Sequence, residues 1–218
     1  MSKSTSACWL RRSLVAAVFV GAASFPLWGN LSLASSQDGS AKKTTGMENV
    51  TEEEMMRMMT EAAEPGEMHK LMADHMAGSW KATAEFEGPG GEMMTSEGQS
   101  KAEMVMGGRH LKENFSGNMM GQPFQGMSIT SYDNIGKKFQ SIWIDEMSSS
   151  MMYAEGSCDE AGKVITFTGK GSDPMTGSDD AKFKYTITFE SEDKHVMKMW
   201  QDMNGEMVEM MTLTYERE

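Results

Sequence analysis

The chain has 218 residues and a formal net charge of −12 at pH 7, so its surface repels nucleic-acid phosphates and anionic lipids. We therefore expect no nucleic-acid partner and no binding to a membrane surface. Methionine, with 26 residues, is the main core-filling residue, because only Leu71, Leu111 and Leu213 follow residue 34. Its flexible, polarisable side chain fills irregular space and lines adaptable binding surfaces.

Residues 1–34 have the features of a secretory signal peptide. Three basic residues precede an apolar run over residues 14–28, and the small residues Ser32 and Ala34 form a cleavage site. Cleavage leaves 17 of the 20 basic residues against 32 acidic ones, a net charge of −15, and a single cysteine, Cys158. We expect an exported protein, periplasmic or extracellular, with no intramolecular disulfide and no membrane span. The segment "RRSLV" resembles a twin-arginine signal, and both export routes remain open.

Two helices are predicted next in the chain. Residues 35–50 are small and polar and indicate a flexible leader, and residues 51–78 form a methionine-rich helical segment. Thr51 and Glu54 have the spacing of a capping box, and Pro65 with Gly66 ends the first helix. The second helix is predicted over residues 67–77, with Gly78 at its end.

From residue 79 to residue 218 the hydrophobic pattern alternates, which is typical of β-strands. In "KFKYTITFE", for example, every second residue from Phe183 to Phe189 is apolar or aromatic. Turn residues separate about ten such segments. They lie near residues 80–87, 94–106, 109–119, 123–132, 138–147, 150–158, 163–171, 181–190, 195–203 and 206–216.

Consecutive hairpin-linked strands with one apolar face predict an antiparallel up-and-down meander. Closure into a calycin-like barrel would leave no sheet edge exposed, so we expect a mainly β fold with a closed barrel and two short N-terminal helices. An open, strongly curved sheet wrapped around the helices is the alternative.

The segment "MHKLMADHM", residues 68–76, has two interpretations. Its residues Met68, His69, Met72, His75 and Met76 fall within about 120° of a helix. Thioether and imidazole groups are suitable Cu(I) ligands, so these residues form a candidate soft-metal site. The alternative, which we favour, is an apolar stripe that packs against the barrel, because methionine replaces leucine throughout this chain.

Several polar residues occupy strand positions that should face the barrel interior. They are Glu113, Trp143, Asp145 and Glu209, of which Glu209 lies among Met207, Met211 and Leu213. A buried carboxylate is unfavourable unless it is paired or hydrogen-bonded, so each either has a structural partner, such as Arg109 or a lysine, or orients a ligand. Arg109, Glu113, Trp143, Asp145 and Glu209 are the candidate ligand-binding residues. Two or three of them converging on one cavity would favour the ligand site.

The region from about His69 to Arg217 resembles a bacterial family catalogued as domain of unknown function 1579. The blocks that carry the resemblance are "HKLMADHMAGSW" (69–80), "MGGRHLKENFSGNMMGQPFQG" (106–126), "YDNIGKKF" (132–139), "WIDEMSS" (143–149) and "SDPMTG" (172–177). The family has aliphatic residues where this chain has Met72 and Met76, which supports the packing interpretation. The resemblance implies a β-rich fold and carries over no catalytic residue.

Three functional hypotheses remain open. The first, which we favour, is a non-catalytic barrel that binds a small, partly apolar molecule. The second is Cu(I) binding through the methionine and histidine stripe. The third is an enzyme in which Asp145, Glu113 and His110 act as general acid and base. No catalytic motif is present, we expect no cofactor, and the pattern indicates no particular oligomeric state.

Overall fold

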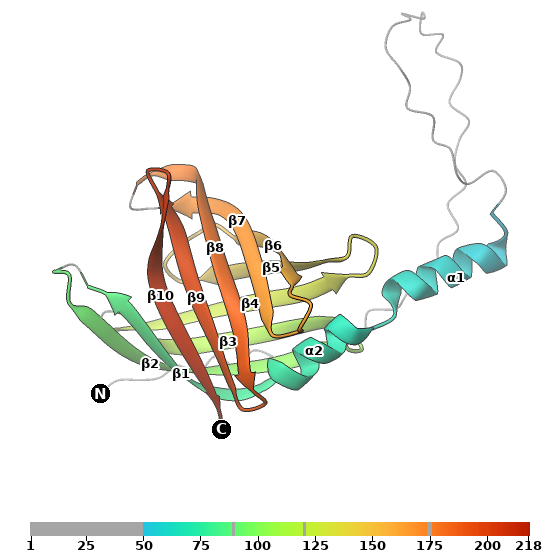
Figure 1. The fold of residues 1–218 in the computed structure, drawn as a ribbon, viewed down its shortest axis with the longest axis horizontal. Coiled ribbons are helices and arrows are strands. Elements are labelled where there is room, and N and C mark those ends of the chain that lie inside the picture. Colours follow the sequence, from blue (N-terminus) through green and yellow to red (C-terminus); the bar gives the residue numbers. More distant parts are fainter. Residues whose placement is uncertain (1–49, 89, 120, 174–175) are drawn as a thin grey trace, which may run out of the picture. The chain divides into compact units, whose positions relative to one another are not determined.

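The computed structural model describes residues 50–88, 90–119, 121–173 and 176–218. The predicted signal peptide, and the predicted leader apart from its last residue, lie outside this part of the chain. The described residues form two helices followed by ten strands (Figure 1). Among these residues, no helix is long and apolar enough to span a membrane.

The two helices have the predicted boundaries, with one difference. Helix α1 (Glu52–Ala63) begins at the predicted capping box, in which the Glu54 N–H donates to Thr51 Oγ1 (3.1 Å) and the Thr51 N–H donates to the Glu54 carboxylate (2.9 Å). Helix α2 (Glu67–His75) ends two residues earlier than expected. Gly78 already belongs to the first strand, so the chain leaves the helix at Met76.

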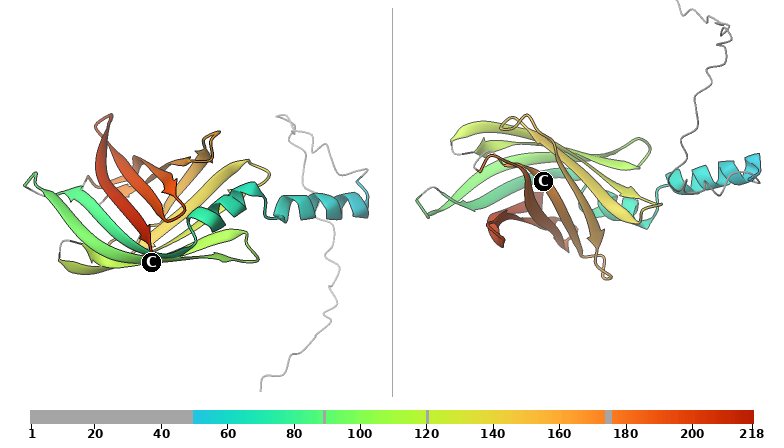
Figure 2. Two further views of the ribbon diagram at one scale, coloured as in Figure 1. Left: turned by 60° about the horizontal axis from the view of Figure 1, so that its bottom comes forward. Right: turned by 90° about the horizontal axis from the view of Figure 1, so that it is seen from above.

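The strands confirm the predicted closed barrel of ten antiparallel strands. Each strand pairs with the next along the chain, and the first pairs with the last. Their bounds are β1 (Gly78–Glu87), β2 (Met93–Val105), β3 (His110–Met119), β4 (Gln122–Asp133), β5 (Lys138–Asp145), β6 (Met152–Cys158), β7 (Val164–Asp173), β8 (Ser178–Ser191), β9 (Lys194–Met203) and β10 (Glu206–Arg217). The strands follow one another around the barrel wall in chain order (Figure 2).

The barrel has two different ends because consecutive strands run in opposite directions. At one end, which we call the helix end, the turns join β2 to β3, β4 to β5, β6 to β7 and β8 to β9. Helix α2 contacts β3 and β4 there, and its Leu71 lies beside Gly162 of the β6–β7 turn. The hairpins that join the other successive strands define the opposite end, which we call the hairpin end.

Arg217 joins the last strand to the end of α2. Its guanidinium donates to the backbone carbonyls of Ala77 (2.9 Å) and Glu192 (2.8 Å), and it lies 4.2 Å from the centre of the Trp80 ring. Cations are stabilising near the last carbonyls of a helix. One side chain therefore connects the end of α2, the closing strand β10 and the β8–β9 turn.

A hydrophobic cluster packs around α2 at the helix end of the barrel. Met72 of α2 is fully buried, and it belongs to the same cluster as Leu111, Phe139 and Phe167. Met76 is also buried in this cluster. The stripe of α2 therefore packs on the barrel, as we favoured from the sequence. Burying each large apolar side chain contributes about 1.5–3 kcal/mol to stability.

Candidate functional site

A cavity of about 300 Å³ occupies the part of the barrel that the core leaves unfilled. It begins beside Met76 at the end of α2 and continues to Met119 and Met147 near the hairpin end. Met147 lines the cavity and is also 67% exposed, so the cavity opens to solvent at the hairpin end. A volume near 300 Å³ is about the lower limit of pockets that hold small organic ligands.

Glycines in the barrel wall help to keep the cavity open. The ring of Trp143 occupies the space that a Cβ atom would need at Gly126, and the rings of Phe115 and Phe183 do the same at Gly98 and Gly169. Because glycine has no side chain, each ring lies against the wall of the barrel instead of extending across it. Glycine within a strand often marks such a close approach.

The cavity wall is predominantly apolar. Its methionines are Met76, Met119, Met147, Met152, Met197, Met199 and Met211, and its aromatic residues are Phe86, Phe115, Phe124, Trp143, Phe183, Tyr185 and Tyr215. Thioether side chains adapt to ligands of different shape, and aromatic rings supply large contact areas. Ligand sites in proteins combine such a wall with a few placed polar groups.

Glu113 is the polar centre of the cavity. Its carboxylate accepts hydrogen bonds from the hydroxyls of Ser100 (2.6 Å), Ser128 (3.2 Å) and Tyr215. Burial, together with the nearby charge of Glu113, raises the pKa of Tyr215, so this phenol stays protonated and acts as a donor. A second cavity of about 40 Å³, lined also by Trp80 and His195, lies on the side of Glu113 toward the helix end.

Tyr185 is the second phenol of the cavity and is also protonated. Burial raises its pKa, a hydrogen bond with Ser141 opposes that change, and the charge of Glu113 adds to it. Ser141 accepts in turn from the Thr130 hydroxyl at 3.2 Å. Hydroxyls of the cavity wall therefore form a polar group around Glu113 within an otherwise apolar surface.

Asp145 has a structural role in holding Trp143. One of its oxygens accepts from the Trp143 indole N–H at 2.7 Å, and the other accepts from the backbone N–H groups of Met147 (2.8 Å) and Ser148 (3.1 Å). The carboxylate thus ends β5, two residues before the predicted end of that strand. It also fixes the indole ring at the hairpin end of the cavity.

The cavity has an acidic character. Its charged lining residues are Glu97, Glu113 and Asp145, and no lysine, arginine or histidine lines it in the part of the chain that the structure describes. Glu97 lies near the mouth, and its carboxylate is 2.9 Å from the ammonium of Lys81. The charge of Glu113, deeper in the barrel, is surrounded by neutral groups.

The structure brings three of the five candidate ligand-binding residues into this cavity: Glu113, Trp143 and Asp145. Arg109 lies in the β2–β3 turn at the helix end, where its guanidinium donates to the Met106 carbonyl (3.1 Å). His110, proposed with Glu113 and Asp145 as an acid–base group, is hydrogen-bonded to Ser131 and lines neither cavity.

Glu209 lies on the outer face of the barrel, contrary to the alternating pattern. The register of β10 against β9 shifts between Glu209 and Met211, so an extra residue reverses the faces on the two sides of the bulge. The Glu209 carboxylate therefore accepts hydrogen bonds from the Lys198 ammonium (3.2 Å) and the Thr212 hydroxyl (2.9 Å) outside the cavity. Met207, expected inside, is 43% exposed for the same reason.

The candidate metal ligands of α2 all lie on the side of the helix that packs on the barrel. Met68 packs partly against the core, His69 Nδ1 accepts from the Gly66 N–H (3.0 Å), and the His75 ring stacks on Phe189 at 4.9 Å. The described residues contain no cluster of three or more histidine, cysteine or acidic side chains placed to hold a metal ion. Cu(I) binding by the stripe stays an untested hypothesis.

Sequence reasoning did not identify Tyr185 and Tyr215 as partners of Glu113. Tyr185 belongs to the alternating segment from Phe183 to Phe189, but residues from four different strands meet at this carboxylate. The order of the strands around the barrel brings them together, and that order was itself a prediction. The signal that could have found them is a phenol on the apolar face of a strand.

Comparison with known proteins places the chain in a sequence family and a fold group. A model of the family described as "Protein of unknown function (DUF1579)" matches residues 64–217. No curated protein matches the sequence. The crystal structure of Rv2717c from M. tuberculosis has a TM-score of 0.54 at 10% identity, covering 71% of this chain and 99% of that chain. This likeness concerns the fold alone.

Two further solved structures are similar at a lower level. The S-type phycobiliprotein lyase CPES from Guillardia theta has a TM-score of 0.48 at 11% identity, over 69% of this chain and 90% of that chain. A redesigned beta barrel has a TM-score of 0.35 at 16% identity, over 69% of this chain and 94% of that chain.

Proposed function

This chain belongs to the DUF1579 family, whose description assigns no activity, and we propose its function from the cavity: it is an exported, non-catalytic protein that binds a small, partly apolar ligand. The observation that carries the proposal is the open cavity of about 300 Å³ with its methionine and aromatic wall. Export is supported by the basic, apolar and small-residue pattern of residues 1–34.

The polar groups of the cavity support binding rather than catalysis. Asp145 uses both oxygens to hold Trp143 and the following turn, and Glu113 is held by hydroxyl donors. His110, the remaining acid–base candidate, is turned to Ser131 at the helix end. A general base must be within hydrogen-bond reach of the proton that it removes, and no histidine, lysine or arginine among the described residues lines the cavity beside either carboxylate.

Binding of a neutral fluorescent probe tests the proposal. The fluorescence of N-phenyl-naphthylamine increases in apolar surroundings, and we expect the wild-type protein to bind this probe saturably. Ala84 lines the cavity from β1, so Ala84→Phe should fill part of the space and weaken binding by at least about tenfold, the equivalent of about 1.4 kcal/mol. The neighbouring Glu85 is exposed, so Glu85→Phe adds the same ring outside the barrel and should leave the affinity unchanged.

The result that would contradict the proposal is a probe signal that does not saturate, or one that Ala84→Phe and Glu85→Phe reduce equally. Either outcome would mean that the probe binds to the surface of the protein. The melting temperatures of both variants, measured alongside, show whether each variant is folded under the conditions of the assay.

A further inference from the structure

Glu113 is an interior carboxylate without a cationic partner among the described residues. The nine ion pairs that these residues form do not include it. Its partners are the neutral hydroxyls of Ser100, Ser128 and Tyr215. Burying a charge is unfavourable unless it is paired or well hydrogen-bonded, and hydroxyls satisfy the lone pairs without neutralising the charge.

The rest of the cavity makes the potential around Glu113 more negative. Asp145 is the other charged residue of the wall without a cationic partner, because Glu97, at the mouth, is exposed and pairs with Lys81, and no basic residue among the described ones lines the wall. Low-dielectric walls strengthen such a potential, because apolar side chains do not screen a charge as water does. A carboxylate, phosphate or sulfate entering this barrel would therefore be repelled, and a cation would be attracted.

Aromatic rings beside Glu113 suit the same kind of ligand. Tyr185 and Tyr215 both line the cavity, and the charge of Glu113 acts on both phenols. The faces of aromatic rings attract ammonium groups, and more strongly where water is excluded. A carboxylate that is hydrogen-bonded to one tyrosine, in a cavity that a second tyrosine also lines, provides a counter-charge and a nearby aromatic surface for one ammonium group.

We propose that the ligand is an amphiphilic amine, whose ammonium group binds at Glu113 and whose apolar tail extends along the methionines toward Met119 and Met147. The ammonium donates a hydrogen bond to the carboxylate of Glu113 and neutralises its charge. The tail contacts the apolar wall up to the mouth at the hairpin end. This inference rests on the proposed binding function and specifies the charge of the ligand.

Competition among three molecules with the same tail tests the inference. Octylamine, octanol and octanoate are each titrated against protein loaded with N-phenyl-naphthylamine, below the concentration at which they aggregate. We expect octylamine to bind wild type about tenfold to hundredfold more tightly than octanol, the range of a hydrogen bond to a charged group. Octanoate should bind more weakly than octanol.

The variant Glu113→Gln removes the charge and keeps the shape of the side chain. In this variant the preference for octylamine over octanol should fall by at least about tenfold, while octanol affinity is retained. Glu97→Gln is the matched control, because Glu97 lies near the mouth and already pairs with Lys81. It should change the preference by less than about threefold, within the range of an exposed charge.

The outcomes separate the two proposals. Equal affinities of wild type for octylamine and octanol would overturn the amine inference even if Glu113→Gln did not fold. An unchanged preference in a folded Glu113→Gln would overturn it as well. If octanol and the neutral probe bind but octylamine shows no preference, the binding function stands and the ligand class is wrong. If the probe does not bind saturably, or Ala84→Phe and Glu85→Phe reduce its binding equally, both proposals fall.

Discussion

The buried His195 makes the protein less stable in acid, and the size of this effect follows from its surroundings. Its side chain is 6% exposed, packs edge-on against the Trp80 ring and stacks on the Tyr215 ring, with centroids 4.5 Å away in both cases. Its Nδ1 atom has no hydrogen-bond partner among the described residues. Burial, with smaller contributions from Arg217 and His75, lowers the pKa of His195 from 6.5 to about 4.

The direction of the pH effect follows from this lowered pKa. Between pH 6.5 and about pH 4 the unfolded chain binds a proton at this imidazole, whereas the folded protein does not. The contribution of the neutral His195 to the free energy of unfolding is therefore fully present above the pKa of the unfolded state. It is lost as the pH falls through that window. The total loss is about 3 kcal/mol, and between about pH 7.5 and about pH 5 it is about 2 kcal/mol.

Urea denaturation at these two pH values, for wild type and His195→Phe, measures this contribution. Phenylalanine keeps an aromatic ring between Trp80 and Tyr215 and cannot take up a proton. We expect the difference in unfolding free energy between about pH 7.5 and about pH 5 to be smaller in the variant by about 2 kcal/mol. The same pH dependence in both proteins would refute the assignment of the acid sensitivity to His195.

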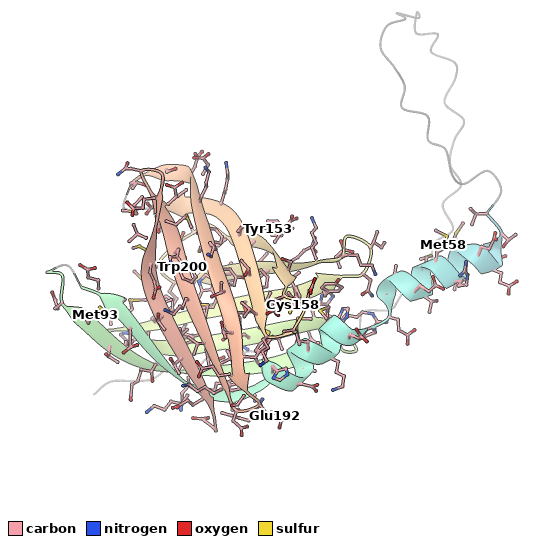
Figure 3. The ribbon with its side chains drawn as sticks, in the orientation of Figure 1. Met58, Met93, Tyr153, Cys158, Glu192 and Trp200 are labelled. Carbon is pink, nitrogen blue, oxygen red and sulfur yellow. The ribbon has the colours of Figure 1, made fainter. Side chains whose placement is uncertain are left out.

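Two other predictions concern the methionines. Met72 is fully buried, so Met72→Ala should lower the free energy of unfolding by about 2–5 kcal/mol. Met56→Ala, at an exposed position, should change it by no more than about 0.5 kcal/mol. Urea denaturation of both variants measures these changes. The bulge in β10 places Met207 outside and Met211 in the cavity, so mild peroxide should oxidise Met207 and the α1 methionines before Met211. Equal rates at Met207 and Met211, read by peptide mass spectrometry, would contradict the placement of the bulge. Met58 is among the exposed α1 methionines and is labelled in Figure 3.

Local patterns in the sequence predicted most of the fold because each one has a local physical cause. The capping box of Thr51 and Glu54 is formed within a single turn of α1. The alternation from Phe183 to Phe189 requires only that one face of β8 be buried. Trp200 lies on the outer face of the neighbouring β9 (Figure 3). The ammonium of Lys184 is 4.6 Å from the centre of the Trp200 ring, as the same alternation requires.

The candidate site was less predictable, because it depends on interactions between distant strands. The inward facing of Glu113 and Asp145 follows from alternation, and both line the cavity. Alternation fails at Glu209, because a single-residue bulge reverses the face and leaves no clear mark in "EMVEMM". The cavity stays open because rings such as that of Trp143 lie against glycines of a neighbouring strand. The sequence alone does not show which glycine lies opposite which ring.

The most direct test of the binding account observes the methionine methyl groups by NMR while octylamine is added. The protein carries its own reporters, because Met197, Met199 and Met211 line the cavity and Met56, Met58 and Met59 lie exposed on α1. We predict that the signals of the cavity methionines shift saturably and that those of α1 stay in place. Unchanged cavity signals, or equal and unsaturated shifts in both groups, would contradict the account.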